Sequence, residues 1–574
     1  MAKGACDMGF SVGVEVILPG GNDWWATIYS AWFGKHFREE SLGKALRELG
    51  ADYTLFYDSL APGKVDACGR IADMCGRLDI PFLLNNTYGD IQGPWIPGTG
   101  RADYGEARLR DATATGKCLG LVWDEVAHRQ INAVDTGDGP YFFDATGLDV
   151  GTCHDRLVAE VTRIVGEYEA HGVASVAELV FPVLMHPLAC AGMTPAPKVL
   201  KESFNPLVLA IAMGAALQYG RPLWAVADLW GVIPFWGTIF HDDREGNPGH
   251  SPDEYLSALL LCYWLGLDSV YTEGLYDLIV PVHTTPEEWE DLRTHPIHHR
   301  GADNPLVMNV RRDGYMLTAY GKYHRWFAKH YVPAHSRPFT FRDVRPRVAV
   351  IALSDSTWCR RGASSFASSD TLFGPTGPAK QARHEAILDA FHLLTHGAVP
   401  REGITWHNEP MASRHQAIAE QIRRDGRMAY PYADDHTGFC PLDGVVVFDH
   451  QVAEEHLRGI SLLICTGEAL SEETQMAVWR CIRSGARCVT LPHLFPEMSA
   501  RYEGTPFEVK IGAGAMLVTE DLMAESARRW IERELGASDQ VHYRFGAWDV
   551  TLAPRDGDER RLDVSVQNVG EDHP

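Results

Sequence analysis

Two short apolar stretches of the chain end on acidic residues, and these are the residues whose types and positions could do chemistry. Residues 120–123 run into Asp124 and Glu125, and residues 269–272 run into Glu273. When the strand–helix pairs along the chain are counted, the first stretch is predicted to be strand four and the second strand seven. Carboxyl groups that face each other across a cleft can act as acid, base or nucleophile toward a glycosidic bond. The pattern therefore predicts glycoside cleavage by Glu125 and Glu273.

Side chains next to the first acidic pair could tune its chemistry. Trp123 could form an apolar wall that raises the pKa of Glu125. Asp124 could orient Glu125 or bind a substrate group. Acidic pairs also commonly cap or flank a loop, so a structural role for this pair stays open. We expect Glu125 to be the proton donor.

The second acidic position has its own alternatives. A glutamate that ends an apolar strand and precedes Gly274 is costly to bury without a purpose. Tyr271 could donate a hydrogen bond to Glu273 and keep it ionised, which suits a nucleophile. A salt bridge at the rim of the fold is the structural alternative for Glu273. Glu178 and Asp228, on two other predicted strands, are the alternative nucleophiles.

Other polar and aromatic residues fall at the same predicted rim and could hold a saccharide. Sugar rings stack on aromatic side chains, and their hydroxyl groups need several donors and acceptors. Packing and turn formation are the ordinary alternative roles for each of them. The candidate substrate-binding residues are Asp58, Asn85, Asn86, Tyr88, Trp95, Trp230 and Trp236, together with Trp123, Asp124, Asp228 and Tyr271.

Histidine-rich stretches invite a metal-binding interpretation. Residues 241–243 (His-Asp-Asp) and 298–299 (His-His) lack convincing metal-site spacing, so we expect solvated loop residues, no metal and no cofactor. We find no P-loop, no strand-to-helix G-x-S-x-G elbow and no H-E-x-x-H motif. A metal-dependent hydrolase or isomerase that uses His241 or His186 is kept as an alternative.

The elements that must position these residues follow from an alternation of strand and helix patterns. A long helix is predicted at residues 198–219 and another at 251–267, where serine, proline and glutamate form a start signal. Repeated units of this length predict parallel strands with helices outside, and the polar strand ends favour a closed (β/α)8 TIM barrel over an open doubly wound sheet. The expected barrel strands are residues 10–18, 52–57, 80–84, 118–123, 173–181, 222–229, 269–273 and 306–310.

The sequence changes character near residue 345. Fresh buried strands alternate with helices and predict a flavodoxin-like or amidotransferase-like α/β domain at residues 344–540. A β-hairpin is predicted in the tail, closed near residues 556–557. We therefore expect a barrel at 1–343, the α/β domain at 344–540 and a small β segment at 541–574. The expected elements of the α/β domain are strands at 347–353, 444–448, 461–465 and 486–491 and helices at 381–395 and 471–484.

Composition narrows the partners and the compartment. The chain has 574 residues, 45% of them hydrophobic, and a net charge of −24, which disfavours nucleic acid as a partner. The first ten residues lack the apolar core of a signal peptide, and we find no run of about 18 apolar residues that would span a membrane. The 12 cysteines show no CxxC pair. We therefore expect a cytoplasmic protein with reduced thiols and no membrane partner.

Together these features resemble retaining glycoside hydrolases of the large (β/α)8 group, whose catalytic glutamates lie on strands four and seven. The layout is similar to that of the family 42 β-galactosidases, in which an amidotransferase-like domain used for trimerisation and a small β domain follow the barrel. The resemblance implies that Glu125 is the acid/base, that Glu273 is the nucleophile and that the chain forms a homo-oligomer, a dimer or trimer. The segments that carry it are 317–323, which is similar to the join between the domains, and 347–353, 461–465 and 486–491.

One departure from that family pattern matters. An asparagine that binds the sugar 2-hydroxyl normally precedes the acid/base, and this chain has Asp124 there. An Asp–Glu pair on strand four also resembles the β-N-acetylhexosaminidases, in which the aspartate orients the substrate's acetamido group as nucleophile. The second domain lacks a G-x-C-x-G elbow around Cys465, so its expected role is oligomerisation or structure, not amidotransfer. The sequence thus predicts a retaining, exo-acting hydrolase of a small saccharide or glycoside, with a substrate-assisted hexosaminidase and a non-hydrolytic carbohydrate-binding protein as alternatives.

Overall fold

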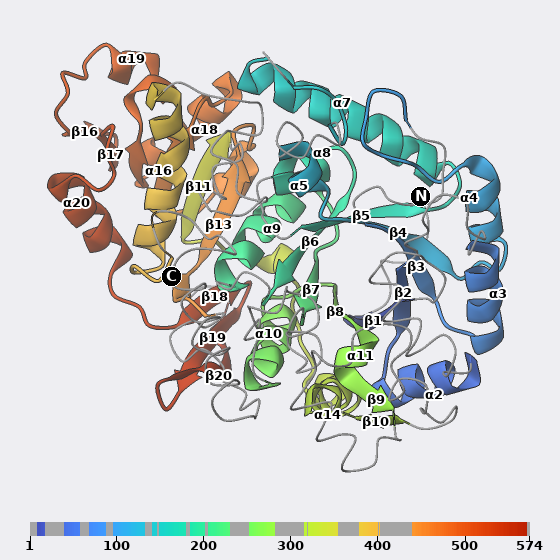
Figure 1. Cartoon of the computed structure of the whole chain (residues 1–574). Helices are drawn as coiled ribbons and strands as arrows, with labels where there is room; N and C mark the ends of the chain where they lie inside the picture. The colour runs from blue at the N-terminus through green and yellow to red at the C-terminus, as the bar shows by residue number, and fades with distance from the viewer. Residues whose placement is uncertain are drawn as a thin grey trace, which may run out of the picture.

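The computed structural model places a barrel, an α/β unit and a small, mostly antiparallel sheet side by side (Figure 1). In Figure 1 the barrel runs from blue to green, the α/β unit is mostly yellow to orange, and the last strands are red. The structure describes residues 9–17, 39–57, 68–87, 96–131, 140–145, 148–179, 184–200, 205–229, 252–281, 315–317, 319–353, 378–399, 401 and 439–570.

Eight parallel strands close into the barrel, because the first strand pairs with both the second and the eighth. This confirms the closed barrel and excludes the open sheet. The strands are β1 (Ser11–Ile17), β2 (Tyr53–Tyr57), β3 (Phe82–Thr87), β4 (Cys118–Asp124), β5 (Ala174–Leu179), β6 (Thr194–Val199), β7 (Trp224–Asp228) and β8 (Ser269–Glu273). The helices between and after them include α2 (Glu39–Leu49), α3 (Cys68–Leu78), α4 (Glu106–Thr113), α5 (Val126–Ile131), α7 (Val150–Glu169), α8 (Met185–Cys190), α9 (Asn205–Tyr219), α10 (Pro252–Trp264) and α14 (Ala319–Trp326).

The predicted strand count is wrong by one. The start of the helix predicted at 198–219 belongs to β6, and α9 begins only at Asn205. Glu273 therefore ends the eighth strand, and Asp228 ends the seventh. The strand predicted at 306–310 lies outside the described residues, and the barrel closes without it. The sequence misleads here because β6 contains Pro195 and Pro197, which are rare inside a sheet.

The barrel interior changes from apolar to charged along the strands. Alternate side chains of a barrel strand point inward, so the inward set repeats every two residues. The inner apolar cluster is Tyr53, Leu55, Leu83, Val122, Val176, Ala196, Val226 and Tyr271. Two positions farther toward the carboxyl ends, the same inward register holds Asn85, Asp124, Glu178, Lys198, Asp228 and Glu273. The strands thus place one ring of polar side chains at the carboxyl-terminal end of the barrel, where barrel enzymes have their active sites.

The second unit is built on a six-stranded sheet in the order β13-β11-β14-β15-β17-β16. All neighbours are parallel except the last pair, and the first four strands have the order of flavodoxin-like sheets. Every strand and helix predicted in this region is present, including the Ser471 cap that accepts a hydrogen bond from the Thr474 N–H group. The elements are β11 (Val348–Leu353), α16 (Pro378–Leu394), β13 (Val445–Asp449), β14 (Leu462–Gly467), α18 (Glu472–Arg483), β15 (Arg487–Thr490), β16 (Phe507–Ile511), β17 (Gly514–Val518) and α20 (Glu525–Leu535).

The C-terminal segment forms more than the expected hairpin. The predicted turn is present, with Asp556 and Gly557 both in the left-handed region at φ 54° and 79°, the backbone that tight hairpins need. However, three strands follow one another here, and β18 also pairs with a strand from inside the second unit. The sheet has the order β12 (Leu442–Asp443), β18 (Val541–Phe545), β19 (Trp548–Arg555), β20 (Asp558–Asn568).

Helix α9 joins the barrel to the second unit. Its residues 205–216 are all buried, because one side covers β6 and the other packs on β13. Gly214 permits the closest approach: a Cβ there would lie 1.6 Å from the carbonyl oxygen of Val447. Among the described helices, none has both the length and the apolar character needed to cross a bilayer.

Candidate active site

A single lysine lies at the centre of the charged ring. Lys198, on β6, is 1% exposed, and its ammonium group contacts the carboxyl groups of five residues from four other strands. Sequence analysis did not predict it, because it assigned the residue to a helix. The Nζ atom lies 2.7 Å from Glu273 Oε2, 2.9 Å from Glu125 Oε1, 2.9 Å from Glu178 Oε1, 3.2 Å from Asp124 Oδ1 and 3.3 Å from Asp228 Oδ2.

The two glutamates that the sequence singled out meet at this lysine. Because Glu125 Oε1 and Glu273 Oε2 lie 2.9 Å and 2.7 Å from the same nitrogen, the two oxygens are at most about 5.6 Å apart. Their side chains are 2% and 18% exposed, so Glu273 is the most accessible of the five acids around Lys198. The pair therefore shares one site, as the sequence predicted, although from strands four and eight.

The backbone of Glu125 explains how two adjacent acids reach the same lysine. Successive residues of a strand point to opposite faces, so Asp124 and Glu125 could not both face inward in a regular strand. Glu125 has left the strand and adopts φ 52°, while its N–H group donates to the Glu178 carbonyl oxygen at 2.8 Å. A left-handed backbone at a non-glycine residue costs about 1–3 kcal/mol and is common at functional sites. The strained turn brings the Glu125 carboxyl group into the ring.

More acids than cations lie in the described part of this ring, and the pKa values of Glu15 and Glu273 are raised. Burial raises the pKa of Glu15, on β1, well above its ordinary value, and the charges of Glu178 and Asp124 raise it further. Burial likewise raises the pKa of Glu273, and Asp228, its register neighbour across the strands, adds to the rise. The Glu15 carboxyl group accepts a hydrogen bond from Asn85 at 3.0 Å, so the predicted hydroxyl binder Asn85 contacts an acid of the site.

Lys198 is held as a cation. Burial alone would lower its pKa, but the charges of Asp124, Glu125 and Glu178 outweigh burial and raise the pKa well above its ordinary value. A lysine that forms a Schiff base needs a lowered pKa to expose its lone pair. This lysine is therefore suited to hold carboxylates in place, and not to attack a carbonyl group.

Tyr271 contacts a different acid from the one expected. Its hydroxyl group donates a hydrogen bond to Glu178 Oε2, not to Glu273. Burial and the neighbouring charge of Glu178 raise the pKa of Tyr271 well above its ordinary value, so the phenol keeps its proton. Glu178 is thereby fixed on one oxygen by Tyr271 and on the other by Lys198.

Two predicted substrate-binding residues face away from the barrel interior. Trp123 is fully buried in the outer core, where its ring meets the Tyr168 ring of α7 edge-on with centroids 5.3 Å apart. Asn86 has the same outward parity as its neighbour Leu84, is also fully buried, and its amide group has no hydrogen-bond partner among the described residues. The predictions for Trp123 and Asn86 are wrong because sequence alone does not tell which parity of a barrel strand faces inward.

The remaining predicted residues divide into two groups. His186, on α8, is buried against the second unit, where its Nε2 contacts the Val447 carbonyl oxygen at 2.8 Å, so it takes no part in the barrel mouth. A second group lies outside the described residues: Asp58, Tyr88, Trp95, Trp230, Trp236, His241, His298 and His299.

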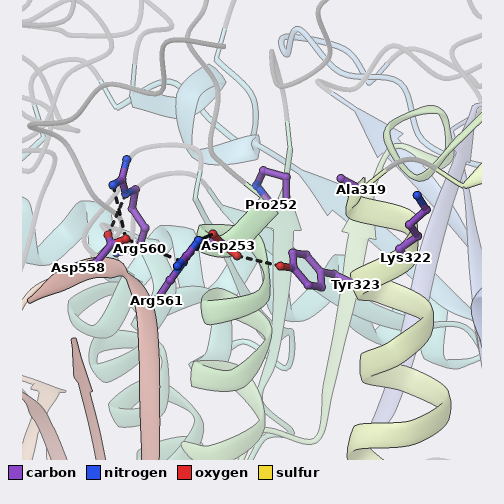
Figure 2. A pocket seen from close by; sticks show the side chains of 8 residues that line it. All are labelled: Pro252, Asp253, Ala319, Lys322, Tyr323, Asp558, Arg560 and Arg561. Carbon is purple, nitrogen blue, oxygen red and sulfur yellow. Dashed lines mark hydrogen bonds and ion pairs between the residues drawn. The ribbon is translucent and has the colours of Figure 1, made fainter. Parts of the chain in front are cut away.

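A hollow of about 550 Å³ lies beside the barrel, between β20 and the first turns of α10 and α14 (Figure 2). Two side chains of its wall bind Asp253: Arg561 contacts Asp253 at 2.8 Å, and the Tyr323 hydroxyl group donates to Asp253 at 2.9 Å. None of the residues that line it belongs to the ring around Lys198. The hollow therefore lies at the contact between the C-terminal sheet and the barrel helices.

No protein-family model and no curated protein sequence matches the chain. Among solved structures, it is similar to the exo-beta-1,4-mannosidase Op5Man5 from Opitutaceae bacterium strain TAV5, at 12% identity over 92% of this chain and 94% of that one, with a TM-score of 0.44. A catalytic mutant of Gan42B, a GH42 beta-galactosidase from G. stearothermophilus, aligns at 9% identity over 97% and 93% of the two chains, with a TM-score of 0.43. The catalytic module of a family 98 glycoside hydrolase from Streptococcus pneumoniae TIGR4 aligns at 9% over 95% and 74%, with a TM-score of 0.39. We take no residue role from these similarities.

Proposed function

We propose that the chain is a glycoside hydrolase that acts through Glu125 and Glu273, retains the anomeric configuration and removes terminal residues from a small saccharide or glycoside. The observation that carries the proposal is the contact of both glutamates with Lys198 Nζ at the carboxyl end of the barrel. An oxygen separation of at most about 5.6 Å suits the retaining geometry of about 5–5.5 Å better than the 6.5–9.5 Å of inverting enzymes.

In the proposed reaction, Glu125 gives its proton to the glycosidic oxygen while the Glu273 carboxylate attacks the anomeric carbon. The alcohol leaves, and a glycosyl ester to Glu273 remains. Glu125, now ionised, removes a proton from water, the water oxygen attacks the same carbon, and Glu273 departs as a carboxylate. The Lys198 charge favours the ionised form of Glu273 against burial and Asp228, and so keeps the nucleophile available.

The reverse assignment has one observation in its favour. A proton donor needs a raised pKa, and the pKa of Glu273 is raised. Azide decides between the two, because it replaces a missing nucleophile and forms a glycosyl azide of inverted configuration. We expect this product from Glu273→Ala. Its formation from Glu125→Ala would establish the reverse roles, and its formation from Asp228→Ala would make the acid on strand seven the nucleophile.

The proposal is tested with p-nitrophenyl glycosides of both anomers, as pyranosides and furanosides. Glu125→Gln and Glu273→Gln should each lower kcat/KM by about 10²–10⁴-fold, because each removes one proton-transfer or bond-forming group. Glu106→Gln, at an exposed position on α4, is the matched control and should keep full activity. Binding of sugars by calorimetry without hydrolysis of any glycoside would instead establish a carbohydrate-binding protein.

The Asp124–Glu125 pair favours one second candidate, a substrate-assisted N-acetylhexosaminidase, since both acids contact Lys198 side by side. In that reaction the substrate's acetamido oxygen attacks, so no enzyme nucleophile is needed. Hydrolysis of p-nitrophenyl N-acetylglucosaminide that survives Glu273→Gln and fails in Asp124→Asn would establish this chemistry. Loss of activity in Glu273→Gln on every substrate would exclude it.

A further inference from the structure

A second cluster of ligand-type side chains lies outside the barrel, where α7 meets the second unit. His154 comes from the first turns of α7, and Asp449 and His450 stand at the carboxyl end of β13. One ligand atom from each of the three residues lies within 4.8 Å of the other two, and all three residues are buried. Roughly 300 positions separate the two parts of the cluster in the chain, so no local motif reveals it.

Both histidines face the same carboxyl group. His450 Nδ1 lies 2.6 Å from Asp449 Oδ1, and His154 Nε2 lies 3.4 Å from Asp449 Oδ2. The latter spacing is close to the ligand–ligand separation in a tetrahedral site with bonds of about 2.0–2.1 Å, whereas the 2.6 Å contact of His450 is a hydrogen bond that metal binding would have to lengthen. The side chains of His154, Asp449 and His450 are 7%, 3% and 12% exposed, so water competes little for these atoms.

The His154 ring presents a buried nitrogen to the cluster. Its Nε2 atom contacts the Asp449 carboxylate at 3.4 Å, a spacing that is long for a hydrogen bond, so a metal ion between the two groups would replace this contact. Its other nitrogen, Nδ1, lies 3.3 Å from Asp155 Oδ1. A carboxylate behind a histidine is the arrangement that orients metal-binding imidazoles, because it fixes the tautomer and leaves the far nitrogen free to coordinate.

The neighbours support the carboxylate in the same way. The Tyr219 hydroxyl group donates to Asp449 Oδ2 at 3.0 Å, and the Gln218 amide oxygen accepts from the Asp449 N–H group at 2.9 Å. His186 lies nearby, but its Nε2 contacts the Val447 carbonyl oxygen, so it supports the wall of the cluster. The cluster is thus buried, rigidly held and lined with the ligand types of zinc sites.

We propose that His154 Nε2, the Asp449 carboxylate and His450 Nδ1 bind one divalent transition-metal ion of the zinc class. Two imidazoles and one carboxylate are a common zinc ligand set, and they leave a fourth position for water or another ligand. The ion would tie helix α7 of the barrel to strand β13 of the second unit. This site is separate from the Lys198 ring and does not depend on the proposed hydrolytic function.

The test uses the untagged full-length chain, stripped with a chelator and then incubated with Zn²⁺ and desalted. We expect about one zinc per chain by mass spectrometry of the metal, and a visible ligand-field spectrum of tetrahedral type after Co²⁺ is substituted. His154→Gln and His450→Gln should each lose both signals while the far-ultraviolet circular dichroism stays unchanged. His330→Gln, at an exposed position outside the cluster, should keep them.

Several outcomes would overturn the site. Metal content below one ion in ten chains, or equal metal content in His154→Gln and the unsubstituted protein, would show that the three residues form only a His–Asp–His network. Zn²⁺ should also raise the melting temperature of the stripped protein and leave that of His154→Gln unchanged. The catalytic variants Glu125→Gln and Glu273→Gln should retain the metal, so a failure of the hydrolase proposal remains distinguishable from a failure of this one.

Discussion

At the scale of single residues, the described part of the site holds one cation among many acids. Lys198 contacts five carboxyl groups, and Glu15 adds a sixth acid whose raised pKa is opposed by the lysine charge. Such an excess of buried acid is costly for stability, and it persists where a function requires it. In the proposed reaction Lys198 is a positioning residue, because it contacts the two glutamates and would act on the substrate only through them.

The first prediction removes this cation. Lys198→Met takes away the charge that favours the ionised Glu273, so the pKa of Glu273 rises further and the acid limb of the kcat/KM profile moves to higher pH. We expect kcat/KM to fall by about 10²–10³-fold at neutral pH, as when an electrostatic group is removed from other active sites. Lys198→Arg keeps the charge and should keep the position of the acid limb. An unchanged pH profile in the methionine variant would contradict the positioning role.

The second prediction concerns Glu15, which is 3% exposed. Its folded-state pKa lies well above the unfolded value near 4.5, so the fold favours the protonated form, and stability is lost as pH rises through the folded pKa. Glu15→Gln cannot ionise and can still accept the Asn85 hydrogen bond. We expect its melting temperature to exceed that of the unsubstituted protein by a few degrees at about pH 8, and to equal it below about pH 4.5. A variant that is less stable than the unsubstituted protein at about pH 8 and equally stable below about pH 4.5 would show that the charge of Glu15 stabilises the fold.

How far the site can be predicted from sequence depends on what each residue shows locally. Glu125 and Glu273 are visible because each follows an apolar strand, and both belong to the ring around Lys198. Lys198 itself is hidden by the two prolines that precede it in β6. Glu15 gives a signal that sequence analysis passed over, since an acid inside an apolar strand is rarely buried without a role.

At the scale of elements, the unexpected pieces are β6 and α9. β6 ends at Val199, because the next residue, Leu200, has a φ of 78° that breaks the strand, and the Leu200 N–H group donates to Asn205 Oδ1 at 2.8 Å where α9 begins. The helical pattern of α9 is uniformly apolar, because barrel and second unit cover it on two sides. An amphipathic pattern would have marked the residue at which the helix begins. Without one, the apolar sequence predicts a helix that extends back into β6.

The third prediction tests this packing. Gly214→Ala places a Cβ 1.6 Å from the Val447 carbonyl oxygen, and no side-chain rotation can relieve a clash with backbone. We expect a loss of about 1–3 kcal/mol or more in the free energy of unfolding, measured by urea denaturation. Gly166→Ala is the matched control: it lies in α7, nothing stands within 4 Å of its added Cβ, and it should gain about 0.5–1 kcal/mol. Equal stabilities of the two variants would contradict the close contact of α9 with β13.

At the scale of the whole molecule, the three predicted segments are less separate than their sequences indicate. β18 pairs with β12 from the second unit, the Phe339 and Phe545 rings stack with centroids 4.7 Å apart, and the Ser257 hydroxyl group of α10 donates to the Arg560 carbonyl oxygen. These contacts join the C-terminal sheet to both larger units. The predicted boundary at 541 therefore falls inside a packed core. The sequence does not reveal this, because strand pairing between distant segments leaves no mark on local sequence.

The last prediction follows from that sharing. A chain that ends at residue 540 loses β18, β19 and β20, which leaves β12 without its partner and uncovers the Phe339 ring. It also loses the Tyr543 hydroxyl group that donates to the Val445 carbonyl oxygen at 2.6 Å, next to the start of β13. We expect this chain to aggregate or to melt at a markedly lower temperature, seen by size-exclusion chromatography and circular dichroism, whereas a chain that ends at residue 570 keeps every strand and serves as the control. Equal melting temperatures for the two chains would show that the barrel and the second unit hold together without the C-terminal sheet.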